Sequence, residues 1–106
     1  MESIYAAIAL FGITACIGLY LLSLVIRDQQ TPKAVALIHG ILAVVGLILL
    51  ITYSTGHDVS PLASIILFSV TAVMGIVLLY KDLKGSIPHV LAIAHGIIAV
   101  AGFVLL

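Results

Sequence analysis

Two histidines lie within long apolar segments of this sequence, where ionisable side chains are rare. His39 occurs in the run AVALIHGILAVVG, and His95 in the run VLAIAHGIIAVAG. An imidazole binds metal ions, carries protons and takes part in hydrogen bonds. Ionisable residues in such segments by default mark a functional site. The alternative is structural: two neutral histidines that hydrogen-bond to backbone carbonyls, or to each other, where helices pack.

The two histidines occupy equivalent positions of an internal repeat. Residues 31–50 read TPKAVALIHGILAVVGLILL, and residues 87–106 read IPHVLAIAHGIIAVAGFVLL. At an offset of 56 residues (95 − 39), the two segments share a proline, a histidine and two glycines: Pro32 and Pro88, His39 and His95, Gly40 and Gly96, and Gly46 and Gly102. We therefore expect one domain, residues 1–106, made of two helix-pair repeats at about 1–56 and 57–106.

A weaker pattern joins four apolar segments. Each contains a ring followed by Ala four residues later and Gly seven residues later, as in FGITACIG, HGILAVVG, FSVTAVMG and HGIIAVAG. The ring positions are Phe11, His39, Phe68 and His95. On a helix these offsets place the ring, the Ala and the Gly on one face. We expect Phe11 and Phe68 to fill the half of the protein beyond the histidines.

The composition indicates a membrane protein. Of the 106 residues, 64% are hydrophobic and 8% are charged, whereas soluble domains carry about 25% charged residues. In lipid, backbone polar groups must be satisfied within the chain, and these runs lack the alternation of barrel strands, so we expect helices. Four segments approach the roughly 20 residues needed to cross a bilayer: 4–26, 34–53, 61–80 and 89–106. The net charge is zero and no basic run is present, so nucleic acid is not expected as a partner.

Short connections and the basic residues predict the topology. The connections are too short for anything but sequential neighbours, which indicates an all-α, integral membrane four-helix bundle that runs up-down-up-down. Every Lys and Arg falls in or beside two connections, 27–33 and 81–88: Arg27, Lys33, Lys81 and Lys84. The positive-inside rule places both connections in the cytoplasm and both termini outside, in a cytoplasmic-type (inner) membrane. His57 is expected in a solvated outer loop.

Such a bundle places the second and fourth segments on a diagonal. With neighbouring axes about 8–10 Å apart, the diagonal axes are roughly 11–14 Å apart. That distance is too long for a hydrogen bond between His39 and His95, but it suits a metal atom between two imidazoles. A bare zinc ion would need about four ligands, and two are evident at this depth. Haem supplies four pyrrole nitrogens of its own, so we predict haem b with His39 and His95 as axial ligands.

Small residues around the histidines predict a slot for the flat macrocycle. The expected haem pocket consists of alanines and glycines from all four segments: Ala15, Gly18, Ala36, Ala43, Gly46, Ala72, Gly75, Ala92, Ala99 and Gly102. The propionates would face the nearer, cytoplasmic surface, where four basic residues are available for charge-assisted hydrogen bonds: Arg27, Lys33, Lys84 and His89. Small residues also suit ordinary helix packing, and the basic residues also follow from the positive-inside rule.

The pairs His39-Gly40 and His95-Gly96, on helices lined by small residues, resemble the bis-histidine sites of transmembrane four-helix b-type cytochromes. The resemblance covers the site and the four-segment layout. It implies electron transfer, or redox or haem sensing, with a quinol or a redox protein as partner. Many such proteins hold two haems, whereas here Phe11 and Phe68 stand in the outer half. With both axial positions taken by histidine, oxygen activation is disfavoured, so an electron carrier or binding protein is expected ahead of an enzyme.

Other functions stay open on the sequence alone. The length and the four segments also fit a small transporter, in which His39 and His95 would carry protons. A third possibility is an accessory subunit of a membrane complex, packed through its Gly and Ala faces. A copper site of His39, His95 and Cys16 ranks below haem. The lipid bilayer is expected as the surroundings of the protein, and a homo-oligomer is compatible with the apolar surface.

Overall fold

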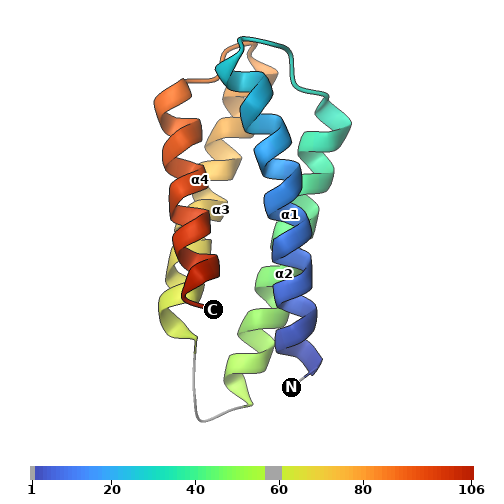
Figure 1. Ribbon diagram of the computed structural model, residues 1–106, viewed down its shortest axis with the longest axis vertical. Coiled ribbons are helices and arrows are strands. Elements are labelled where there is room, and N and C mark those ends of the chain that lie inside the picture. Colours follow the sequence, from blue (N-terminus) through green and yellow to red (C-terminus); the bar gives the residue numbers. More distant parts are fainter. Residues whose placement is uncertain (1, 57–60) are drawn as a thin grey trace.

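The protein is a bundle of four helices. The structure, a computed structural model, describes residues 2–56 and 61–106. Within these residues the helices are α1 (Glu2–Ile26), α2 (Lys33–Thr55), α3 (Leu62–Leu83) and α4 (His89–Val104), as Figure 1 shows. The all-helical prediction is confirmed, and each helix corresponds to one of the four apolar segments. His57 lies outside the described residues, so its outer-loop placement stays a prediction.

Prolines and two unusual backbone conformations define the ends of the helices. Pro32, Pro61 and Pro88 occupy the N-cap positions of α2, α3 and α4, where the absent N–H would have no partner within the helix. The connection after α1 turns at Asp28, with φ of 55°, and the connection after α3 turns at Gly85, with φ of 91°. Both connections lie at the same end of the bundle (Figure 1). We call this end the loop end.

The four helices pack in a ring. The molecule measures 44 × 22 × 19 Å along its principal axes. Both α1 and α3 pack against α2 and α4. No pair of Cα atoms within 8 Å joins α1 to α3, or α2 to α4, in the described residues, so these pairs form the two diagonals. The helices that carry His39 and His95 therefore lie diagonally opposite, as the sequence predicts. Packing is more extensive between α1 and α2, and between α3 and α4, than between the two repeats.

All four helices expose large apolar side chains. Leu19 is 65% exposed, Ile48 57%, Ile76 71% and Ile97 64%. Helices α1, α2 and α3 contain apolar stretches of 23, 23 and 22 residues, long enough to cross a membrane, whereas α4 is apolar but shorter, with 16 residues. A helix that is apolar on all sides requires either a large protein core or lipid around it. The core of this bundle is small, which is the pattern of a membrane protein.

Candidate functional site

The histidines of α2 and α4 each lie against a glycine of the neighbouring helix in the same repeat. A Cβ atom placed on Gly18 of α1 would lie 2.9 Å from Cε1 of His39. A Cβ atom placed on Gly75 of α3 would lie 3.2 Å from Cε1 of His95. Both glycines therefore permit a close approach of an imidazole to a helix backbone. We call these four residues the histidine layer.

A second layer uses the same construction with the helices exchanged. Phe11 of α1 lies against Gly46 of α2, where an added Cβ would be 3.1 Å from the ring, and Phe68 of α3 lies against Gly102 of α4, at 3.2 Å. The two phenylalanine rings stack on each other, with centroids 4.0 Å apart and an interplanar angle of 14°. These four residues form the phenylalanine layer, and the repeated ring-to-glycine spacing of seven residues accounts for both layers.

The two imidazoles are farther apart than the two phenylalanine rings. The centroids of His39 and His95 are 6.3 Å apart, and the rings meet edge-on at 67°. Each repeat contributes one imidazole to this pair. The centre of the bundle therefore holds two potential metal-binding side chains that come from diagonal helices.

A backbone hydrogen bond orients one of the histidines. Nδ1 of His39 donates to the carbonyl oxygen of Thr14 at 3.0 Å, because a carbonyl can only accept. With Nδ1 protonated, the lone pair of a neutral ring is on Nε2, the arrangement of a typical metal-binding histidine. Nδ1 of His95 is also buried, but no hydrogen-bond partner contacts it in the described residues. The two sites are thus similar in position and differ in this hydrogen bond.

The hydroxyl groups of Thr14 and Thr71 donate their hydrogen bonds to the backbone and not to the histidines. Each hydroxyl donates to a carbonyl on its own helix, Thr14 to Leu10 at 2.6 Å and Thr71 to Leu67 at 2.8 Å. The sequence analysis did not single out either threonine. The sequence does contain a signal for them, because in FGITACIG and FSVTAVMG a threonine follows the phenylalanine by three residues. Their backbone carbonyls lie one turn from the glycines that the rings contact.

The predicted pocket residues divide into three groups. Gly18 and Gly75 contact the histidines directly, whereas Gly46 and Gly102 contact the phenylalanines instead. Ala15 is exposed on the outside of α1 and is not brought to the histidines. The remaining predicted residues are buried or half-buried: Ala36, Ala43, Ala72, Ala92 and Ala99.

The four basic residues predicted to bind propionates all have contacts within the protein. Lys33 forms an ion pair with Asp82, and Nε2 of His89 lies 2.9 Å from a carboxylate oxygen of Asp28. Arg27 donates to the carbonyl of Ser23 at 3.1 Å, and the ammonium group of Lys84 lies 5.5 Å from the centroid of the Tyr80 ring. Lys33 and His89 are thus held by carboxylates of this chain.

Asp82 is the residue of this region that the sequence analysis missed. It is 8% exposed and accepts hydrogen bonds from Thr31 and Lys33. A buried carboxylate requires such compensation for its charge. The signal in the sequence was an acidic residue, Asp82, near the end of the mostly apolar α3, together with a basic residue, Lys33, at the start of α2. Because Lys33 belongs to the first repeat and Asp82 to the second, the pair joins the two repeats.

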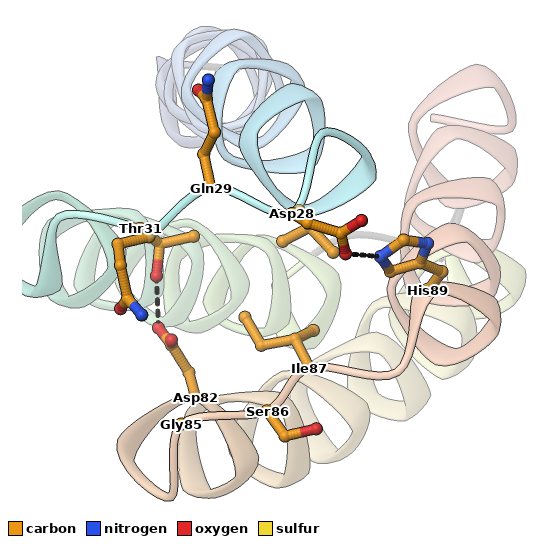
Figure 2. A pocket seen from close by; sticks show the side chains of 10 residues that line it. Asp28, Gln29, Thr31, Asp82, Gly85, Ser86, Ile87 and His89 are labelled. Carbon is orange, nitrogen blue, oxygen red and sulfur yellow. Dashed lines mark hydrogen bonds and ion pairs between the residues drawn. The ribbon is translucent and has the colours of Figure 1, made fainter.

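A cavity of about 300 Å³ lies at the loop end, between the two connections. Figure 2 shows the contact between Asp28 and His89 on one side of it and the contact between Thr31 and Asp82 on the other, with Ile87 between them. Val25 also lines the cavity. We call this space the loop-end cavity.

Metal ligands other than the two imidazoles are not gathered at the site. In residues 2–56 and 61–106, no group of three or more His, Cys, Asp or Glu side chains is placed to hold a metal ion. Cys16 is exposed and does not join His39 and His95. A bare zinc ion would therefore lack ligands, whereas a cofactor that needs two axial imidazoles would have both. The sequence matches no protein-family model, and no curated protein and no solved structure is similar to it.

Proposed function

We propose that this protein is a membrane b-type haem protein, in which one haem is held between His39 and His95 for electron transfer or for redox or haem sensing. The observation that carries this proposal is the separation of 6.3 Å between the two imidazole centroids. A metal atom bonded to one nitrogen of each ring, at about 2.0–2.1 Å, requires centroids roughly 6 Å apart. The separation thus suits one metal atom between the rings.

The phenylalanine layer supplies a comparison within the same molecule. Both layers consist of two rings on one diagonal and two glycines on the other, but the phenylalanine rings approach to 4.0 Å. The imidazoles do not close to that distance, although Gly18 and Gly75 allow them to approach the backbone of α1 and α3. The stacked phenylalanines and the edge-to-face imidazoles are both ordinary contacts between rings, but only the imidazoles carry nitrogen atoms that can bind a metal.

The ligand set favours haem over a bare ion. Haem brings four pyrrole nitrogens and requires axial ligands alone from the protein. His39 would bind through Nε2, because Nδ1 donates to the carbonyl of Thr14, and this hydrogen bond also fixes the orientation of the ring. His95 would supply the second axial nitrogen. When bound, the haem supplies one-electron redox chemistry, and two histidine ligands leave no open position for oxygen.

We expect the bundle that contains this site to be surrounded by the lipid bilayer. We infer that the helices cross the membrane alternately up and down, with the loop end in the cytoplasm and the termini outside. The basic residues Arg27, Lys33, Lys81 and Lys84 all belong to the loop end, in agreement with the positive-inside rule. The exposed apolar side chains of all four helices would face the lipid chains.

The first experiment is an absorption spectrum of the detergent-purified protein, as isolated and after reduction with dithionite. We expect a sharp Soret band, with split visible bands in the reduced state, as for a six-coordinate b-type haem. A protein that is colourless even after expression with added haem would contradict the proposal. In that case proton-coupled transport through His39 and His95, measured in vesicles, becomes the function to test, and an accessory role follows if transport is also absent.

A further inference from the structure

The contacts that join the two repeats differ along the length of the bundle. In the phenylalanine layer, Phe11 and Phe68 stack face to face, and in the histidine layer the two imidazoles meet edge-on. At the loop end the repeats are joined by polar contacts: Lys33 with Asp82, Thr31 with Asp82, and Asp28 with His89. The interface between the repeats is therefore apolar at one end and ionic at the other.

The apolar end is closed by tight packing. Phe11 and Phe68 are 5% and 7% exposed, and the neighbouring Ala7 and Leu50 are completely buried. Separating the repeats at this end would break the aromatic stack and expose the best-packed part of the core. The phenylalanine end should therefore stay closed while other parts of the interface move.

The ionic end can open more easily. The side chains of Asp28 and His89 are 83% and 43% exposed, so their contact contributes little to stability. Lys33 is 42% exposed but its partner Asp82 is buried, so opening this contact must bring the carboxylate of Asp82 into water or give it another partner. The loop-end cavity lies between these contacts and is lined by residues from both repeats, including Val25 and Ile87. The interface between the repeats is thus already incomplete here.

We propose that the loop-end cavity is the entrance to the histidine layer, and that the two repeats separate there, about the closed phenylalanine layer, to admit the haem. This inference rests on the proposed haem function. At about 300 Å³ the cavity has the volume of only the smallest ligand pockets, so passage of a macrocycle requires the ion pairs between the repeats to break.

The same ion pairs explain how the entrance closes again. Lys33 and His89 stand at the first position of α2 and α4, six residues before His39 and His95, or roughly 9 Å along each helix. Asp82 contacts Lys33, and Asp28 contacts His89. A propionate is also a carboxylate, so it would replace an aspartate as the partner of Lys33 or His89. One carboxylate is exchanged for another, and the basic residue keeps a negatively charged partner.

The first test measures the rate at which the apoprotein takes up haem, from the growth of the Soret band after mixing. Asp82→Asn removes one charge of the ion pair between the repeats and should load haem at least about threefold faster than the unchanged protein. Lys81→Gln is the matched control, since it removes a charge from the same end of α3 without altering the Lys33–Asp82 pair. Equal loading rates in the Asp82→Asn variant and the control would argue against the entrance.

The second test closes the entrance without altering Asp82, the carboxylate of α3. In a Cys16→Ala background, Asp28→Cys and His89→Cys are joined by a short bis-maleimide cross-linker that contains a cleavable disulfide. Haem uptake should slow by at least about tenfold in the joined protein and recover after reduction. Uptake at the same rate in the joined and reduced forms would overturn the proposed entrance while leaving the haem function intact. Failure of the unchanged protein to bind haem would overturn the haem function, and the entrance with it.

Discussion

His39 of α2 and Gly18 of α1 are in direct contact, so close that a Cβ atom on the glycine would lie 2.9 Å from Cε1 of the imidazole. Real Cβ atoms essentially never approach another atom this closely, so any larger residue at position 18 must displace the ring. The same relationship, at 3.2 Å, holds between Gly75 and His95. The position of each imidazole therefore depends on a glycine in the neighbouring helix of its own repeat.

Gly18→Ala should displace His39 and weaken the proposed haem site. The added methyl group overpacks the contact, which typically costs about 1–3 kcal/mol of stability. Gly40→Ala is the matched control, because no atom lies within 4 Å of a Cβ atom at that position, and Ala is favoured over Gly in a helix by up to about 1 kcal/mol. Thermal unfolding in detergent and the ratio of haem to protein measure the two effects. Equal haem content in both variants would contradict the close contact.

His39→Ala and His95→Ala should each abolish bound haem. One remaining imidazole cannot complete a six-coordinate iron, and the shortened side chain leaves an apolar cavity on its side of the site. His57→Ala is the control, since the sequence places His57 in a loop away from the histidine layer. The measurement is the reduced absorption spectrum of each purified variant. Full haem retention in both single variants would exclude axial ligation by this pair.

Phe68→Ala should destabilise the bundle, because the ring is 7% exposed and stacks on Phe11 with centroids 4.0 Å apart. Loss of a buried phenylalanine side chain costs about 3–5 kcal/mol. Val73→Ala on the same helix is the control, since Val73 is 63% exposed and its loss should cost far less. Unfolding of both variants in the same detergent provides the comparison. Similar unfolding free energies would show that the phenylalanine layer contributes no special stability.

Asp82→Asn should destabilise the loop end more than Asp28→Asn. Asp82 is buried and bonds to Thr31 and Lys33, so weakening these contacts should cost about 1–3 kcal/mol. The side chain of Asp28 is 83% exposed, and loss of its pair with His89 should cost roughly 0–1 kcal/mol. Thermal unfolding at low and high salt separates the two variants. The ranking would be refuted by an Asp28→Asn variant that unfolds at the lower temperature.

Labelling of single cysteines in sealed vesicles or cells tests the proposed orientation. In a Cys16→Ala background, a thiol at Ser86→Cys, in the exposed connection between α3 and α4, should react only with reagents present on the cytoplasmic side. A thiol at Gly56→Cys, at the other end of α2, should react from outside. The reverse labelling pattern would show that the protein has the opposite orientation. Reaction of both thiols from the same side would rule out helices that alternate in direction across the membrane.

Much of the fold could be predicted from the sequence because long apolar segments leave the backbone few choices. Apolar runs of about 20 residues, separated by short connections that contain Pro32, Pro61 and Pro88, are compatible with helices and little else. The equivalence of His39 and His95 followed from the internal repeat, and their placement on diagonal helices followed from the order of the segments. These predictions depend on local properties of the chain, so they needed no knowledge of side-chain contacts.

The contacts of individual small residues could not be predicted in the same way. The sequence analysis assigned Gly46 and Gly102 to the histidines, but these glycines contact Phe11 and Phe68. Helix periodicity shows which residues share a face, but it does not show which residue of the neighbouring helix lies opposite. That pairing depends on the relative positions of the two helices along the axis of the bundle. The packing of the rings against the glycines sets these positions.

The sequence by itself determined the number and length of the helices, the two-fold repeat, the histidine pair and the gathering of basic residues at one end. The tertiary structure decided the partners: Gly18 for His39, the Thr14 carbonyl for its Nδ1, and Asp82 for Lys33. The physical reason is the range of the interactions. Helix formation and hydropathy act within a segment, whereas ring packing and ion pairs join residues that meet only after the segments have assembled.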